Sequence, residues 1–288
     1  MNENKITRRE FAAKMAAAGA VASLGAAVLH CSGGTKQTPV ALQLYTVRDL
    51  MKNDFKGTVE KVAKIGYDAV EFAGYGGLSA KEVKQLLKNT GLQVAGTHEG
   101  FEGLQANTEE RIAFNLGIGN KNIVVPSMPG KWRKSNADGI KEFAAEMNKL
   151  GTKVHDAGMQ LLYHNHWFEF AKLDGKTIYE ILLKNTDANL VKLEIDVAWA
   201  QRGGKIPADL IRQEGSRVRS LHMKDFLGDG NYTLAPVGTG VVDMSGIIKA
   251  AREVGVQWFI VEQDRMKRPA LEAIEISLKN MRKLLKQA

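Results

Sequence analysis

The chain alternates between short apolar runs and longer segments whose apolar residues recur with the period of an α-helix. The apolar runs, each predicted to form a strand, are residues 40–44, 69–72, 92–97, 122–125, 160–164, 191–196, 217–222 and 258–261. The helical segments that follow them are residues 55–65, 80–88, 108–116, 140–157, 177–183, 208–211, 244–254 and 270–285. Strands that alternate with helices indicate a parallel sheet covered by its crossover helices.

A glycine stands between several of the helical segments and the next apolar run, at Gly66, Gly91, Gly119, Gly158 and Gly255. Helices often end in a residue with positive φ, which glycine adopts at little cost. One turn type repeated at near-regular intervals favours eight equivalent units over an open, doubly wound sheet. We therefore predict an α/β fold, a (β/α)8 TIM barrel, over residues 39–288. A length of 288 residues alone would also allow two smaller domains.

The first 31 residues have the pattern of an export signal peptide. The segment Thr-Arg-Arg-Glu-Phe at 7–11 resembles a twin-arginine signal, and a run rich in Ala, Gly, Val and Leu follows at 15–29. This run is too short to span a bilayer and has the length of a signal-peptide apolar region. The alternative is a buried or amphipathic N-terminal helix.

Cys31, the only cysteine, directly follows this apolar run, so an intramolecular disulfide is excluded. Its position resembles that of the lipidated cysteine of bacterial lipoproteins, and a tether at 32–38 follows. His30 departs from the lipoprotein pattern, which prefers a small residue there. We predict an exported protein, periplasmic or anchored to a membrane by a lipid on Cys31. The alternative is an incidental cysteine in a peptide that is cleaved away.

The charge distribution argues against a nucleic-acid partner. The formal net charge is +8, and four basic and two acidic residues in the first 31 leave +6 spread over the rest. Nucleic-acid binding is typically indicated by a stripe of Lys and Arg with interleaved aromatic residues. The sequence shows no such stripe. An anionic substrate remains compatible with this charge, and the sequence leaves the formation of a homo-oligomer open.

Four predicted strands run into two ionisable residues spaced two apart. These pairs are His164 and His166, Glu194 and Asp196, His222 and Lys224, and Glu262 and Asp264. Residues two apart in a strand share a face, and in a barrel of this kind the carboxyl ends of the strands build the active site. Buried carboxylates and imidazoles need a neutralising partner. Two histidines with two carboxylates suit Mn²⁺, Zn²⁺, Co²⁺ or Fe²⁺.

Four motifs are the most specific parts of the sequence: Tyr-His-Asn-His at 163–166, Leu-Glu-Ile-Asp-Val-Ala-Trp at 193–199, Leu-His-Met-Lys-Asp at 221–225 and Val-Glu-Gln-Asp at 261–264. Through them, the chain from residue 40 onward resembles the xylose isomerase-like barrels, which include sugar isomerases and epimerases, inosose dehydratase and, more distantly, endonuclease IV. The resemblance implies one divalent metal ion held by Asp196, His222 and Glu262, with His164 where the family has a glutamate.

That replacement argues against the epimerisation in which two glutamates exchange a proton across the sugar. A histidine can act instead, because an imidazole titrates near neutrality and can accept and return a proton. We therefore predict His166, His164, Glu262 and Lys224 as catalytic residues. Lys224 would hold a substrate oxygen or, alternatively, pair with a carboxylate. The alternative for the two histidines is a core position with hydrogen bonds to the backbone.

The predicted substrate-binding residues are Glu71, His98, Glu194 and Trp199. Glu194 has two alternatives, which are to orient a metal ligand or to pair with Lys224. Trp199 would form a wall for the sugar or belong to the core. The polar segment at 226–242 is expected to contact the substrate or to act as a lid.

These residues predict a divalent-metal-dependent isomerase or epimerase that acts through an enediolate on a sugar or keto-sugar. The first alternative is a lyase that eliminates the aglycone of a 3-keto-glycoside, since the same enediolate can expel a β-oxygen. The second is a non-catalytic exported sugar-binding protein. A DNA-repair endonuclease would need further metal ligands and a basic surface, neither of which is evident.

Overall fold

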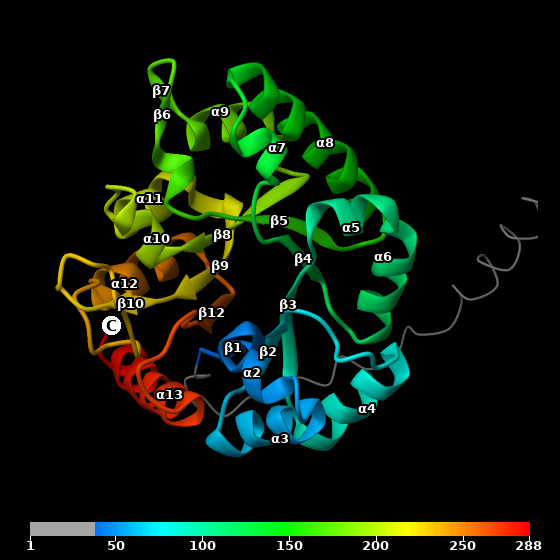
Figure 1. Ribbon diagram of the computed structural model, residues 1–288, viewed down its shortest axis with the longest axis vertical. Helices are drawn as coiled ribbons and strands as arrows, with labels where there is room; N and C mark the ends of the chain where they lie inside the picture. The colour runs from blue at the N-terminus through cyan, green and yellow to red at the C-terminus, as the bar shows by residue number, and fades with distance from the viewer. Residues whose placement is uncertain (1–37) are drawn as a thin grey trace, which may run out of the picture. The chain divides into compact units, whose positions relative to one another are not determined.

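The computed structural model of the protein describes residues 38–288 (Figure 1). The predicted export signal at 1–31, including Cys31, lies outside the described residues, and only residue 38 of the predicted tether lies within them. In residues 38–288, every helix is too short or too polar to cross a membrane.

Eight parallel strands close into a barrel in the order β1-β12-β9-β8-β5-β4-β3-β2, which confirms the predicted fold. The strands are β1 Val40–Gln43, β2 Ala69–Phe72, β3 Gln93–His98, β4 Asn122–Val125, β5 Gln160–His164, β8 Val191–Asp196, β9 Val218–Met223 and β12 Trp258–Val261. Neighbours in sequence are neighbours in the barrel, so the strand ends that carry the paired residues lie side by side.

Helices surround this barrel as an outer ring (Figure 1). The predicted helices are all present, as α3 Phe55–Ile65, α4 Ala80–Thr90, α6 Thr108–Gly117, α8 Ala137–Asp156, α9 Ile178–Asn185, α11 Pro207–Glu214, α12 Met244–Val254 and α13 Ala270–Gln287. Their ends follow local sequence rules. Ser79 and Glu82 form a capping box at the start of α4, and Gly66 ends α3 with a φ of 107°.

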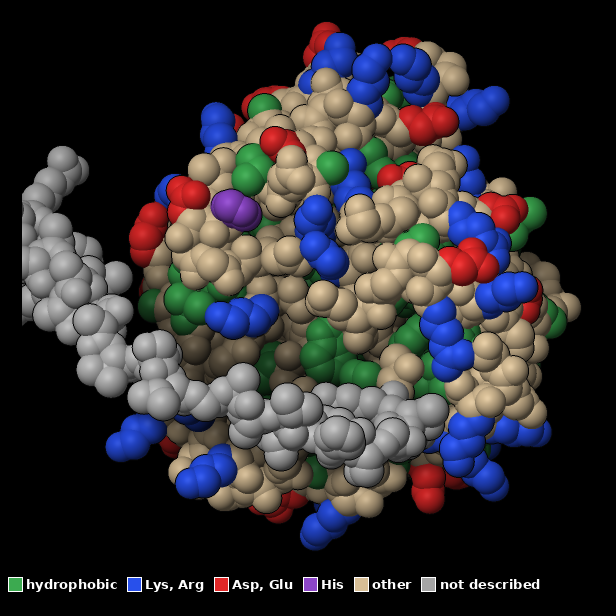
Figure 2. All heavy atoms as spheres, turned by 180° about the vertical axis from the view of Figure 1, so that it is seen from behind, with side chains coloured by type: hydrophobic (Ala, Val, Ile, Leu, Met, Phe, Trp, Pro, Cys, Tyr) green, Lys and Arg blue, Asp and Glu red, His purple; other side chains and the backbone are tan. Residues whose placement is uncertain are grey.

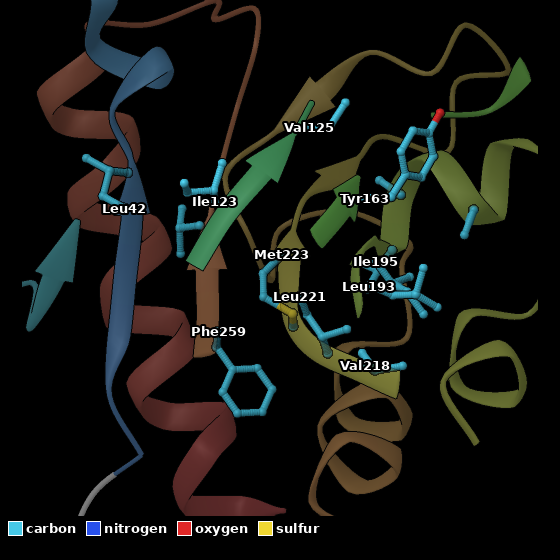
Figure 3. Packing of buried hydrophobic residues seen from close by; sticks show 14 of the residues in the cluster. Leu42, Ile123, Val125, Tyr163, Leu193, Ile195, Val218, Leu221, Met223 and Phe259 are labelled. Carbon is cyan, nitrogen blue, oxygen red and sulfur yellow. The ribbon is translucent and has the colours of Figure 1, made fainter. Parts of the chain in front are cut away.

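The strands bury two separate apolar layers. Residues such as Leu42, Leu221 and Phe259 face the helices in the main core (Figure 3). Their neighbours in sequence, Ala41 and Ile260, belong to a second small cluster with Ala69 and Ala95. Since successive strand residues point to opposite faces, this second cluster fills the barrel interior. The polar residues two positions further along β1, β2 and β12, which are Gln43, Glu71 and Glu262, therefore collect at the carboxyl end of the barrel.

The sequence analysis missed the short elements that follow the strands at this end. They are η1 Leu44–Val47, α2 Arg48–Met51, α5 Phe101–Ala106, α7 Gly130–Arg133, η2 Phe168–Phe170, α10 Val197–Arg202 and the hairpins β6 Lys172–Leu173 with β7 Lys176–Thr177 and β10 Asp225–Phe226 with β11 Leu234–Ala235. A further short element, η3 Gly215–Arg217, precedes β9 at the opposite end. Elements of two to six residues are too short to show a hydrophobic period.

The predicted lid segment at 226–242 is tied to the barrel by Asp225. Its carboxylate accepts hydrogen bonds from the backbone N–H groups of Phe226, Gly238 and Gly240, each at 2.9 Å, and of Val242 at 3.1 Å. The segment is therefore held at four points beside β9, which fixes the residues of the β10–β11 hairpin over the carboxyl end of the barrel.

The face opposite to the view of Figure 1 shows Lys and Arg side chains scattered among Asp and Glu (Figure 2). On that face, outside the area covered by grey atoms, the basic side chains do not gather into a stripe.

Candidate active site

The four predicted pairs converge at the carboxyl end of the barrel. Ligand-type atoms of His164, Asp196, His222 and Glu262 all lie within 4.8 Å of one another, and all four residues are buried. They come from β5, β8 and β9 and from the residue after β12, which are adjacent in the barrel. Barrel closure thus places these four side chains where a single cation could contact them all.

Lys224 is the buried cation of this cluster. Its Nζ lies 3.0 Å from Asp196 Oδ2, 2.7 Å from Glu262 Oε2 and 2.8 Å from Asp264 Oδ2. Burial disfavours the charged ammonium, but the three carboxylates hold the pKa of Lys224 well above its ordinary value. Lys224 is therefore a fixed positive charge, and the i, i+2 partners Glu262 and Asp264 contact it from one side.

Glu194 lies among three imidazoles. Its Oε1 is 2.9 Å from His98 Nε2, 3.2 Å from His164 Nδ1 and 3.0 Å from His222 Nε2. Burial opposes its ionisation, but these imidazoles, His222 foremost, hold the pKa of Glu194 well below its ordinary value. Its Oε2 accepts a hydrogen bond from Ser220 at 2.8 Å. This position corresponds to the alternative in which Glu194 orients metal ligands.

Glu71 lies in the same polar layer. Its Oε2 is 2.6 Å from His222 Nε2 and 3.2 Å from His98 Nε2, and it accepts a hydrogen bond from Gln43 at 2.7 Å. Burial alone would lower the pKa of His98, but Glu71 and Glu194 raise it to about 9. Oε1 of Glu71 is buried and has no hydrogen-bond partner among residues 38–288.

Two cavities open above this polar layer. The inner pocket has a volume of about 410 Å³, and its lining includes His98, His164, His166, Lys224 and Glu262. The outer chamber has a volume of about 910 Å³, and its lining includes Trp199 and the β10–β11 hairpin. Both cavities are lined by Tyr45, His166 and Asp264. His98, His166 and Lys224 thus reach the inner pocket, and Trp199 forms part of the outer wall.

His166 stands at the junction of the two cavities. Burial, with Lys224 as the next contribution, lowers its pKa to about 3, so the imidazole is neutral at pH 7. Its Nδ1 is buried without a hydrogen-bond partner among the described residues. The ring stacks on Trp199 at an interplanar angle of 16°. A neutral imidazole that lines a cavity can accept a proton.

Glu169 is a buried residue of the site that the sequence analysis did not single out. It accepts hydrogen bonds from the Tyr163 hydroxyl at 2.7 Å and from the His166 backbone N–H at 2.8 Å. These bonds hold the turn that follows β5 and so position His166. The only signal in the sequence was a glutamate three residues after the second histidine.

Glu169 should make the stability of the protein depend on pH. Burial raises its pKa from 4.5 to about 7, so the folded state binds the proton more tightly than the unfolded state. This contribution to stability is complete below pH 4.5 and is lost as the pH rises through 7. Between pH 5 and pH 8, the wild type should lose about 3 kcal/mol more unfolding free energy than Glu169→Gln. Urea denaturation at both pH values measures this difference.

Glu102→Gln, at an exposed position in α5, is the control and should keep the wild-type pH dependence. Parallel pH profiles for Glu169→Gln and the wild type would contradict the assignment.

An eight-stranded parallel barrel with imidazoles, carboxylates and a lysine gathered at its carboxyl end has the architecture of a TIM-barrel enzyme. The profile of the family described as xylose isomerase-like TIM barrel matches residues 59–284. The chain therefore belongs to the xylose isomerase-like TIM barrel family.

Relatives of this chain are enzymes that act on small sugar-like substrates. The chain is 24% identical to inosose dehydratase of Clostridium botulinum over 254 residues, 74% of this chain and 83% of that protein. It is 27% identical to inosose dehydratase of Clostridium perfringens over 210 residues, 65% of this chain and 69% of that protein.

Solved structures agree with this placement. A sugar phosphate isomerase/epimerase from Parabacteroides distasonis superposes with a TM-score of 0.74 at 26% identity, covering 87% of this chain and 96% of its own. The IolI protein with a bound zinc atom superposes with a TM-score of 0.68 at 16% identity, covering 86% of this chain and 98% of its own. At that identity, the second likeness shows the shared fold alone.

Proposed function

We propose that the protein is a divalent-metal-dependent isomerase or epimerase that removes a proton next to a carbonyl of a sugar or keto-sugar. The observation that carries this proposal is the convergence of His164, Asp196, His222 and Glu262 to within 4.8 Å of one another. His164 and Glu262 also line the inner pocket, where His166 and Lys224 face the same space. The sugar-converting enzymes among the relatives and neighbours support the same class of reaction.

The four convergent residues suit a metal ion. They offer imidazole nitrogens and carboxylate oxygens, the mixture that Mn²⁺, Zn²⁺, Co²⁺ and Fe²⁺ accept. Asp196 Oδ2 is buried and lacks a well-aligned hydrogen bond, although Lys224 Nζ lies 3.0 Å away. His164, Asp196, His222 and Glu262 would hold the ion. When bound, it would act as a Lewis acid that polarises a carbonyl oxygen of the substrate.

The remaining chemistry falls to two side chains of the inner pocket. His166, neutral and in the lining of the inner pocket, would take the proton from the carbon beside the carbonyl and leave an enediolate. Lys224, held charged by three carboxylates, would bind a substrate oxygen and stabilise its developing negative charge. Return of the proton to the neighbouring carbon is isomerisation, and return to the opposite face is epimerisation.

The outer chamber favours a second candidate, a lyase that acts on a 3-keto-glycoside. Its volume of about 910 Å³ adjoins the inner pocket at His166 and offers space for an aglycone. The same proton abstraction would then be followed by cleavage of the bond to the aglycone oxygen.

We also propose that the protein is exported, either to the periplasm or to a membrane that holds it through a lipid on Cys31. That location suits the scavenging of glycosides better than central metabolism.

Proton nuclear magnetic resonance in D₂O separates these functions. Ketoses and 3-keto-glycosides are incubated with the protein before and after removal of metal by EDTA. Deuterium gained at a sugar carbon with the aglycone retained indicates an isomerase or epimerase, and release of the aglycone indicates a lyase. A non-catalytic sugar-binding protein would show neither change, and its sugar affinity would survive both EDTA and His166→Ala.

Glu194→Gln tests how the metal ligands are oriented. Glu194 Oε1 faces His164 Nδ1 and His222 Nε2, and the opposite ring nitrogens point to Asp196 and Glu262, at 3.9 Å and 2.8 Å. Glutamine keeps an acceptor oxygen but removes the negative charge that faces these imidazoles. We expect Mn²⁺ and Zn²⁺ to bind about 10- to 100-fold more weakly, the usual cost of losing a residue that orients a ligand.

Isothermal titration of EDTA-stripped protein measures this affinity. Glu169→Gln, at a nearby glutamate that does not face these nitrogens, is the matched control and should keep the wild-type metal affinity. Equal affinities of the wild type and Glu194→Gln would remove the orienting role of Glu194.

A further inference from the structure

The outer chamber carries an excess of positive charge. The basic residues in its lining are Arg48, Arg133, Arg202, Arg265 and Lys267. The acidic residue among the lining is Asp264, which already pairs with Lys224 at 2.8 Å. Among residues 38–288, no carboxylate oxygen lies within 4.0 Å of any of these five cations. The chamber therefore gathers five positive charges that form no ion pair with the described residues.

Two of these arginines are held in place by groups that leave their charge intact. Arg48 donates to the carbonyl oxygens of Tyr45 and Asp264, each at 2.8 Å. The guanidinium of Arg202 lies 4.1 Å from the ring centroid of Trp167 and 4.9 Å from that of Tyr232. Cation–π contacts order an arginine but do not cancel its charge. These side chains are thus preorganised to meet an anion.

The same chamber presents aromatic rings. Tyr45 is 44% exposed, and Trp167 and Tyr232 are each 40% exposed. Trp199 is buried in the wall, and its Nε1 has no hydrogen-bond partner among the described residues. Exposed apolar rings grouped around a cavity indicate a ligand-binding surface.

A neutral sugar would leave these cations unpaired and these ring faces exposed to water. We propose that the outer chamber binds an anionic aromatic group that is attached to the sugar, such as a phenyl ring bearing a carboxylate. The substrate class is then 3-keto-glycosides of acidic phenols, the substrates of the lyase candidate, with the sugar in the inner pocket. The position of the sugar rests on the proposed function, whereas the charge and the rings of the chamber do not.

Binding of matched glucosides to the full chain tests this assignment without turnover. The probes are 4-carboxyphenyl, phenyl and methyl β-D-glucopyranoside, followed by tryptophan fluorescence and isothermal titration. We expect the carboxyphenyl glucoside to bind about tenfold more tightly than the phenyl glucoside, the effect of about one charge-assisted hydrogen bond. The phenyl glucoside should in turn bind more tightly than the methyl glucoside.

The double variant Arg265→Ala/Lys267→Ala removes two exposed cations of the chamber that make no ion pair with the described residues. The variant should reduce the preference for the carboxyphenyl glucoside to about threefold or less, since each exposed pair between a cation and the probe's carboxylate contributes modestly. The affinity for the phenyl glucoside should not change, because that probe has no charge. Lys84→Ala/Lys88→Ala, at exposed positions on α4, removes the same net charge elsewhere and should keep the tenfold preference. The two double variants therefore separate a local site from a general effect of net charge.

Equal affinities for the charged and neutral aryl glucosides would overturn the assignment, as would identical behaviour of the two double variants. Tighter binding of glucose 6-phosphate than of glucose, without a preference among aryl glucosides, would identify a phosphate site and overturn the aromatic part. A preference for the carboxyphenyl glucoside in a protein that shows neither deuterium exchange nor aglycone release would reject the proposed function and support the chamber assignment. Turnover without that preference would support the proposed function and reject the chamber assignment.

Discussion

Replacing His166 with alanine is expected to lower kcat/KM about 100- to 10,000-fold, the usual contribution of a positioned acid/base group. Burial lowers the pKa of His166 to about 3, so its imidazole is neutral at pH 7. It lines both cavities, and its Nδ1 has no partner among residues 38–288. Alanine removes this base, whereas His164 and the other three predicted metal ligands remain.

Steady-state kinetics on the ketose or 3-keto-glycoside that shows turnover, with metal analysis of the same samples, measures this effect. His155→Ala, at an exposed position near the end of α8, is the matched histidine control and should keep the wild-type kcat/KM. The metal content of His166→Ala should equal that of the wild type. A kcat/KM within a factor of about three of the wild-type value would exclude His166 as the base.

Asp196→Asn is expected to weaken divalent metal binding more than about 100-fold. Losing a direct ligand should cost more affinity than losing a residue that only orients one. Asparagine keeps the size of aspartate. It can still accept the hydrogen bond that the backbone N–H of Trp199 donates to Asp196 Oδ1 at 2.8 Å. The start of α10 should therefore be preserved, and the loss should come from the missing negative charge. Turnover should fall in parallel and recover only at high metal concentration.

Isothermal titration of Mn²⁺ and Zn²⁺ into EDTA-stripped protein tests this expectation. Asp264→Asn is the matched control, because Asp264 also pairs with Lys224 but does not belong to the convergent set of four residues. Its metal affinity should stay close to that of the wild type. Full turnover by EDTA-stripped protein, or equal affinities of Asp196→Asn and the wild type, would refute the metal-dependent mechanism.

The predicted strands agree with the observed ones because their signal is local. Leu42 and Val261 face the helices, whereas Ala41 and Ile260 face the barrel interior, so both faces are apolar and each strand reads as a continuous apolar run. The i, i+2 spacing of Glu194 and Asp196 also brings both carboxylates to one face of β8. Their approach to His164 and His222 then follows once the strands are parallel and adjacent.

Residues that act through neighbours distant in sequence could not be assigned in this way. The sequence left three roles open for Glu194, which were substrate contact, orientation of a metal ligand and pairing with Lys224. In the structure its carboxylate lies among imidazoles from three strand ends. Asp225 belonged to a recognised motif, yet its four backbone hydrogen bonds to the segment at 226–242 depend on how that segment folds back. Glu169 gave no distinct pattern, because one glutamate near a histidine is common.

The sequence by itself determined the (β/α)8 barrel, because strand and helix periods, glycine turns and paired polar residues are all short-range features. It also determined which residue types stand at the strand ends. Only the tertiary structure decided what those residues face and what surrounds the site. The five cations of the outer chamber come from separate segments that have no common spacing, and they meet only because barrel closure brings the loops after different strands to one end.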